Sequence, residues 1–167
     1  MTKPVRFYPA LSLLLFLGNN ALAQQQPATP NVTVYTAESL LQRIHNASDT
    51  LYVVNFWATW CKPCVAELPA FNAFQKAHTS ETVKVILVSL DFREDMEKRL
   101  IPFLQKHPPA CEVVLLNESN GNDFIDRIDS RWSGAIPATL VTSRNKGKNL
   151  FYEKTLTEAA LEEILKK

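Results

Sequence analysis

Two cysteines separated by two residues, Cys61 and Cys64, are the residues whose type and spacing could do chemistry. The apolar, β-branched residues 51–54 before them predict a buried strand, and the apolar spacing of residues 65–78 after them predicts a helix. Pro63 would then lie in the first helical turn, where its missing N–H costs nothing. Unpaired N–H groups and the helix dipole at that place stabilise a thiolate, the nucleophile of disulfide exchange. The pair is therefore suited to cycling between a dithiol and a disulfide.

A structural disulfide, half of a zinc site and a haem attachment site are alternative interpretations of the pair. Tetrahedral zinc needs two further ligands at matching spacing, and Cys111 with three scattered histidines supplies no such pattern. Haem attachment needs a histidine directly after Cys64, where Val65 stands. The sequence context favours a redox pair and no metal. We expect Cys61 to be the exposed attacking thiol and Cys64 the buried resolving thiol.

The third cysteine, Cys111, leaves an odd thiol in the chain. We predict that it is a buried free thiol at the start of a strand. A third redox thiol and an intermolecular disulfide are the alternatives.

The residues around the pair resemble a known family. Residues 55–69 read Asn-Phe-Trp-Ala-Thr-Trp-Cys-Lys-Pro-Cys-Val-Ala-Glu-Leu-Pro, and this string resembles the exported TlpA/ResA-like thiol-disulfide oxidoreductases of bacteria, a branch of the thioredoxin superfamily. In that motif Lys62 and Pro63 stand between the cysteines and support the redox pair. We expect Trp57 to pack in the core and Trp60 to form an apolar, substrate-contacting rim beside the first cysteine. No prosthetic group is implied.

The loop of residues 132–139 also fits the resemblance. An Ile-Pro before a strand is commonly an ordinary trans strand opener. In the thioredoxin superfamily, however, the matching proline is cis and packs beside the two cysteines, and the residue before it pairs with the substrate backbone. The resemblance therefore implies a cis Pro137 and a peptide-binding role for Ile136.

Glu67 has two interpretations. An acid in the first turns of a helix is usually solvated and compensates the dipole. Glu67 lies three residues after Cys64, so both side chains share one face and the carboxylate could take and return the thiol proton. Thioredoxin uses a buried aspartate at the position of Asn55, which cannot titrate, so the chain departs from that pattern. The resembled TlpA/ResA-like proteins have a glutamate at the position of Glu67, which implies a proton-handling role.

The elements that must position these residues follow from hydrophobic periodicity and turn residues. Pro69 falls inside the helix after the cysteines and is expected to bend it, and Pro102 interrupts a later helix. Thr36 and Thr157 are predicted helix caps, and residues 120–122 a turn. The predicted strands cover residues 32–35, 51–57, 83–90, 112–116, 138–142 and 149–153, and the predicted helices cover 37–47, 65–78, 94–106, 123–130 and 157–167.

Strands that alternate with helices predict a mostly parallel sheet with helices on both faces, and the final hairpin adds an antiparallel edge. The resemblance implies more narrowly a thioredoxin-like α/β fold, a three-layer α/β/α sandwich around a mixed sheet. It also implies an inserted helix and strand between the half with the cysteines and the half with the cis proline. With 167 residues and 46% hydrophobic content, the chain suffices for one such domain.

The first residues have the pattern of a signal peptide. Lys3 and Arg6 precede a short apolar run, and small residues end at Ala23 with cleavage spacing. The run is shorter than the roughly 18 residues that a membrane anchor needs. We therefore predict a signal peptide over 1–23, a flexible lead-in over 24–30, a thioredoxin-like domain over 31–167, and a soluble periplasmic protein without a membrane span after cleavage.

The formal net charge is +1 and the basic residues are scattered, which indicates neither a nucleic-acid nor an anionic-membrane partner. With the resemblance, the sequence predicts a monomeric disulfide reductase that acts on protein thiols and disulfides. A membrane thiol reductase would supply its electrons, and the resemblance implies cytochrome c maturation or periplasmic thiol maintenance as the setting. A disulfide-forming oxidant and a binding module without turnover are the alternatives. A peroxiredoxin-like peroxidase is disfavoured because the pattern Pro-x-x-x-Thr-x-x-Cys is missing.

Overall fold

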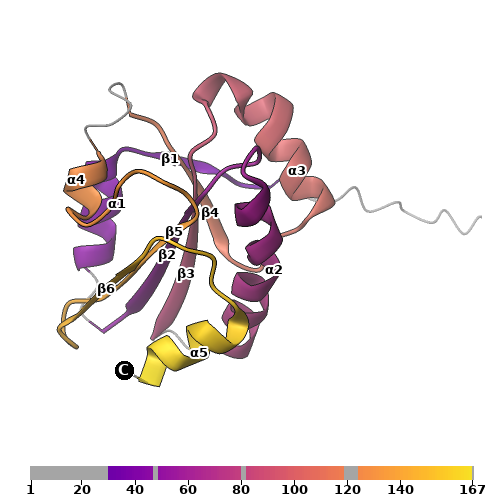
Figure 1. Cartoon of the computed structure of the whole chain (residues 1–167). Coiled ribbons are helices and arrows are strands. Elements are labelled where there is room, and N and C mark those ends of the chain that lie inside the picture. Colours follow the sequence, from indigo (N-terminus) through magenta and orange to yellow (C-terminus); the bar gives the residue numbers. More distant parts are fainter. Residues whose placement is uncertain (1–29, 47–48, 80–81, 119–123, 167) are drawn as a thin grey trace, which may run out of the picture.

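A computed structural model describes residues 30–46, 49–79, 82–118 and 124–166. Within these residues, six strands form one mixed sheet in the order β1-β4-β3-β2-β5-β6 (Figure 1). All six lie where the sequence predicts strands, with ends that differ by at most one residue. The strands are β1 (Thr33–Tyr35), β2 (Leu51–Trp57), β3 (Val83–Ser89), β4 (Glu112–Leu116), β5 (Ala138–Ser143) and β6 (Lys148–Tyr152).

Helices cover both faces of the sheet (Figure 1). Because successive strand residues point to opposite faces, Val53 and Trp57 of β2 pack in one core and Val54 and Phe56 in the other. The first core holds buried side chains of α2, α3 and α5, and the second those of α1 and α4. This arrangement confirms the predicted three-layer sandwich. The helices are α1 (Ala37–Asn46), α2 (Lys62–Ala77), α3 (Ile101–Lys106), α4 (Ile125–Ile128) and α5 (Glu158–Lys166).

β2 is buried along its whole length, pairs in parallel with β3 and lies antiparallel to β5. Its register places Asn55 opposite Thr139 of β5, and Trp57 opposite Ser89 at the end of β3. The chain leaves β2 at Trp57 and enters α2 at Lys62, so the fully paired central strand fixes the position of the two cysteines.

The predicted insertion is present. Between β3 and β5 the chain forms α3 and β4, and β4 pairs in parallel with β3 on one side and β1 on the other. The helix predicted over 94–106 is interrupted, as Pro102 signalled, because this residue has no N–H to donate to an earlier carbonyl. Instead the Ile101 N–H bonds to the Met96 carbonyl, five residues back, in a wider turn. The segment consists of a 3-10 turn, η1 (Arg93–Asp95), a π-helical turn, η2 (Met96–Leu100), and α3.

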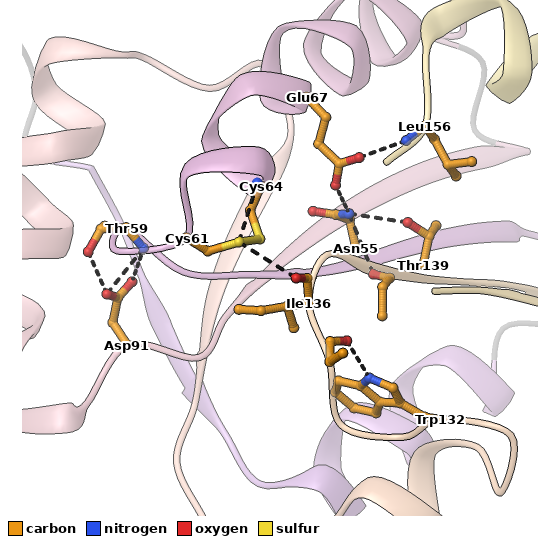
Figure 2. Close-up of a disulfide and its surroundings, with 12 residues drawn as sticks. Asn55, Thr59, Cys61, Cys64, Glu67, Asp91, Trp132, Ile136, Thr139 and Leu156 are labelled. Atoms are coloured by element: carbon orange, nitrogen blue, oxygen red, sulfur yellow. Dashed lines mark hydrogen bonds between the residues drawn. A yellow bond between two sulfur atoms is a disulfide. The ribbon is translucent and has the colours of Figure 1, made fainter. Parts of the chain in front are cut away.

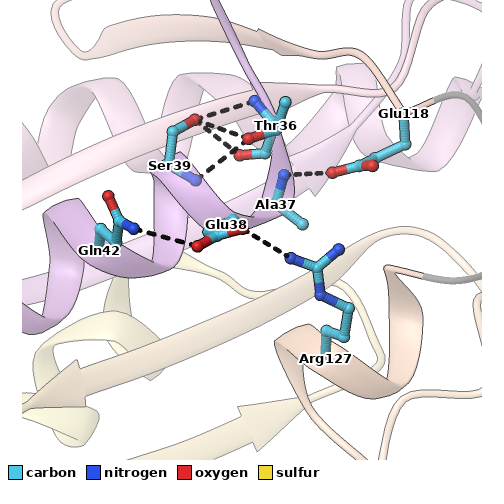
Figure 3. Close-up of polar contacts among 7 residues, drawn as sticks. All are labelled: Thr36, Ala37, Glu38, Ser39, Gln42, Glu118 and Arg127. Atoms are coloured by element: carbon cyan, nitrogen blue, oxygen red, sulfur yellow. Dashed lines mark hydrogen bonds and ion pairs between the residues drawn. The ribbon is translucent and has the colours of Figure 1, made fainter.

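Polar contacts at the start of α1 join three segments of the chain (Figure 3). Thr36 caps the helix as predicted: its Oγ1 accepts the Ser39 N–H at 3.2 Å, and Ser39 Oγ accepts the Thr36 N–H at 2.9 Å. The carboxylate of Glu118, just after β4, accepts the N–H of the first residue of α1. Arg127 of α4 lies 3.9 Å from the carboxylate of Glu38. These bonds hold the end of the insertion against α1.

The other helices differ from the predictions mainly at their ends. Pro69 lies inside α2, and Thr157 caps α5 through a 3.2 Å bond from the Ala160 N–H, as predicted. The extended backbone of Asp129 (φ −162°, ψ 125°) ends α4 before residue 130. The turn predicted over 120–122, the signal peptide and lead-in residues 24–29 lie outside the described residues. In the described ranges, no helix is both long and apolar enough to cross a bilayer.

Candidate active site

The two cysteines meet at the start of α2 and form the predicted disulfide (Figure 2). Cys61 is the N-cap of α2, and its Sγ accepts the backbone N–H of Cys64 at 3.3 Å. Pro63 lies in the first turn, as predicted. Cys61 Sγ therefore lies at the positive end of the helix dipole and accepts a first-turn N–H, and both favour its thiolate when the disulfide is reduced.

The exposure of the two sulfur-bearing residues differs in the predicted order. Cys61 is 7% exposed and Cys64 0%. The expectation that Cys61 is an openly exposed thiol is wrong for this disulfide form, because the Ile136 loop covers it: the Ile136 carbonyl oxygen lies 3.8 Å from Cys61 Sγ. Trp60 is 56% exposed, and its role as a substrate-contacting rim stays a prediction, whereas Trp57 is fully buried in the core as expected. Lys62 is exposed between the cysteines.

The Ile136–Pro137 peptide is cis, as the resemblance implied. Pro137 is buried and Ile136 half-buried, with its carbonyl turned toward the disulfide (Figure 2). The loop is fixed from within, because the indole N–H of Trp132 donates to the Ala135 carbonyl at 2.8 Å. A peptide lying along Ile136 would thus lie next to Cys61.

Asp91 is a positioning residue that sequence reasoning missed. It is 3% exposed and accepts the Thr59 backbone N–H at 3.1 Å and the Thr59 hydroxyl at 2.5 Å (Figure 2). The Ser89 hydroxyl also donates to it at 2.7 Å. Asp91 follows the end of β3, which lies beside the end of β2, so it holds the loop that leads into Cys61. An acid directly after a buried strand was the available signal.

Glu67 is 5% exposed, so the interpretation as a solvated helix-start acid is wrong. Its Oε1 accepts the Asn55 amide N–H at 2.8 Å, and its Oε2 accepts the Leu156 backbone N–H at 2.8 Å (Figure 2). Burial raises the pKa of the Glu67 carboxyl, while these two bonds act in the opposite direction. Glu67 lies one turn after Cys64 on α2, as the spacing predicted, and its proton-handling role stays a prediction.

Cys111 is a buried free thiol, as predicted. It lies 3.5 Å from the Phe71 carbonyl oxygen and from Asn72 Oδ1. Burial raises the pKa of this thiol to about 12, which favours the protonated form at neutral pH. In the part of the chain that the structure describes, no group of three or more histidine, cysteine or acidic side chains could hold a metal.

The curated relatives of the chain include proteins named as thiol-disulfide oxidoreductases. The chain is 33% identical over 101 residues to sporulation thiol-disulfide oxidoreductase A of Bacillus subtilis. The aligned residues make up 60% of this chain and 61% of that relative. It is 27% identical over 86 residues to the thiol-disulfide oxidoreductase ResA of Bacillus cereus, and the aligned residues make up 52% of this chain and 50% of that relative. The chain thus spans between half and about three fifths of the length of these relatives.

Solved structures of thioredoxin-like proteins share the fold. A thioredoxin-related protein of Neisseria meningitidis serogroup B superposes with a TM-score of 0.61 at 25% identity, covering 72% of this chain and 84% of that chain. StoA of Bacillus subtilis gives a TM-score of 0.54 at 23% identity, covering 71% and 84%. The sequence profile of the AhpC/TSA family matches residues 27–146, which include the cysteine pair, Glu67 and the cis proline, and the chain belongs to this thioredoxin-like family.

Proposed function

We propose that the protein is an exported, monomeric thiol-disulfide oxidoreductase that reduces disulfides of client proteins. The observation that carries the proposal is the Cys61–Cys64 disulfide at the start of α2, with the exposed Trp60 and the Ile136 carbonyl beside its first sulfur. The names of the relatives in the two Bacillus species support this activity.

In the proposed reaction, the Cys61 thiolate attacks one sulfur of a client disulfide. The client's other sulfur leaves as a thiolate and takes a proton from water, and a mixed disulfide remains. Cys64 then attacks Cys61 Sγ, the Cys61–Cys64 disulfide forms, and the second client sulfur leaves with the electron pair. Glu67 accepts the proton that Cys64 loses and returns it when the pair is reduced again. A membrane thiol reductase restores the dithiol by becoming oxidised itself.

The client backbone would lie along Ile136, beside the cis Pro137, and its side chains would contact the Trp60 ring. Pairing with Ile136 brings the client disulfide to the partly covered Cys61 without moving the sheet. Lys62 and Pro63 shape the exposed turn between the cysteines.

The direction of electron flow gives the first prediction. We expect the reduction potential of the Cys61–Cys64 pair to lie near the value of thioredoxin, about −270 mV, and far from that of strong oxidants, about −120 mV. Equilibration with glutathione or dithiothreitol buffers, followed by alkylation and mass spectrometry, measures it. A potential near the oxidant value would assign the protein to disulfide formation. A pair that does not exchange with thiols would assign it to the binding-module alternative.

Export gives the second prediction. If residues 1–23 are a signal peptide, the protein recovered from the periplasm should begin at Gln24, or at its cyclised form. Mass spectrometry of the N-terminal peptide checks this. Exported protein that still begins at Met1 would contradict cleavage, and protein confined to the cytoplasm would contradict export.

A further inference from the structure

Asn55 is a fully buried polar residue at the centre of the sheet, and one end of its amide is unmatched. Its Nδ2 donates to Glu67 Oε1 at 2.8 Å and lies 3.2 Å from Thr139 Oγ1 and 3.5 Å from the Ala138 carbonyl. Its Oδ1 is buried and has no hydrogen-bond partner among the described residues. A buried acceptor without a donor costs free energy, so this oxygen is expected to have a partner in another state of the site.

The geometry indicates what that partner is. Asn55 points to the face of the sheet that α2 covers, because its nitrogen bonds to Glu67 of α2. Cys64 and Glu67 lie three residues apart, one turn along the same face of that helix. With the amide nitrogen directed to Glu67, the oxygen at the other end is directed to the side of Cys64. Figure 2 shows the amide in this orientation, with its oxygen turned away from Glu67 and toward the disulfide.

The orientation of the amide is fixed rather than arbitrary. In its ionised form the Glu67 carboxylate only accepts hydrogen bonds, so the donating nitrogen of Asn55 faces it. The Leu156 N–H holds the second carboxylate oxygen, which keeps Glu67 in place. Asn55 therefore directs an acceptor oxygen toward the disulfide. The disulfide sulfurs carry no hydrogen, so they cannot donate a hydrogen bond to this oxygen.

We propose that Asn55 is a positioning residue for Cys64: in the dithiol form the Cys64 thiol donates a hydrogen bond to Asn55 Oδ1. This inference rests on the proposed redox function. When two electrons and two protons convert the disulfide into two thiols, with two donor thiols oxidised to a disulfide, Cys64 acquires the S–H that the amide oxygen lacks. The bond exists only in the dithiol state, so Asn55 stabilises the reduced pair relative to the oxidised pair.

The test compares redox equilibria of variants. Asn55→Leu keeps the approximate size of the side chain and removes the acceptor. We expect its equilibrium constant for reduction by glutathione to fall about tenfold, which corresponds to a potential about 30 mV more negative. The matched control is Thr139→Val, which removes a neighbour of Nδ2 and leaves Oδ1 in place, and should change the constant less than about twofold. Equal constants for wild type and Asn55→Leu, or equal shifts in both variants, would overturn the inference.

A second measurement needs no substitution at Asn55 and remains valid if Asn55→Leu does not fold. The side-chain carbonyl ¹³C resonance of Asn55 should shift when the wild-type pair is reduced with a phosphine. In the Cys64→Ala variant the resonance should stay near its position in the oxidised wild type. The same position in reduced wild type and in Cys64→Ala would contradict the bond. Because the phosphine reduces the pair chemically, this result stands even if the wild type fails to exchange with glutathione, which would contradict the proposed function alone.

Discussion

Cys61→Ser is expected to reduce disulfide exchange to the uncatalysed rate, whereas Cys64→Ser is expected to accumulate mixed disulfides with client proteins. Cys61 is the sulfur at the helix N-cap, beside Trp60 and the Ile136 carbonyl, so we expect a client to reach it rather than Cys64. Cys64 is fully buried and is bonded to Cys61. Without Cys64, attack by Cys61 still occurs, but no neighbouring thiol releases the client.

Both variants can be compared with wild type by non-reducing electrophoresis and mass spectrometry of trapped complexes. Cys111→Ser is the matched control, since Cys111 is buried and its thiol has a pKa raised to about 12. It should exchange disulfides like the wild type, and Cys111 should resist alkylation in the native protein. Complexes trapped equally by Cys61→Ser and Cys64→Ser would contradict the assigned roles.

The central strands were predictable to within a residue because a short run of apolar residues in the sequence is enough to indicate a buried strand. The residues that begin β2 are apolar and largely β-branched, which is typical of a strand covered on both faces, and the strand is buried along its whole length. The helical segment over 94–106 was harder. Pro102 signalled an interruption, but the wide turn formed by the Ile101 N–H and the Met96 carbonyl depends on how the insertion packs.

The candidate site also has features that the local sequence predicts and features that depend on distant parts of the chain. The cysteine spacing, the flanking tryptophans and the Ile-Pro peptide are local signals, and the structure brings them together as predicted. The environment of Glu67 is not local. One of its partners is a backbone N–H at Leu156, 89 residues further along the chain, and any residue type except proline could supply that donor. The cover over Cys61 is likewise a tertiary contact with a distant loop.

Burial of Glu67 makes the free energy of unfolding depend on pH, which the sequence alone did not show. Because burial raises its pKa above the ordinary value of 4.5, the folded state binds this proton more tightly than the unfolded state. The free energy of unfolding therefore falls as the pH rises through the window between the ordinary and the raised pKa, by at most about 1.4 kcal/mol per pH unit from this group. Glu67→Gln removes the titration, so its stability should vary less with pH in that window.

The same substitution separates a structural Glu67 from a proton-handling one. If the carboxylate takes the Cys64 proton, Glu67→Gln should slow exchange with a small disulfide by about a hundredfold, the low end of general acid–base effects, and change the shape of the pH–rate profile. Gln can still accept the Leu156 N–H, so the loss should exceed any loss of stability measured by denaturant unfolding. Glu162→Gln, an acid of α5 that pairs with His78 far from the motif, is the control and should leave the profile unchanged. Superimposable profiles for wild type and Glu67→Gln would remove Glu67 from the reaction and leave it as an anchor for Asn55.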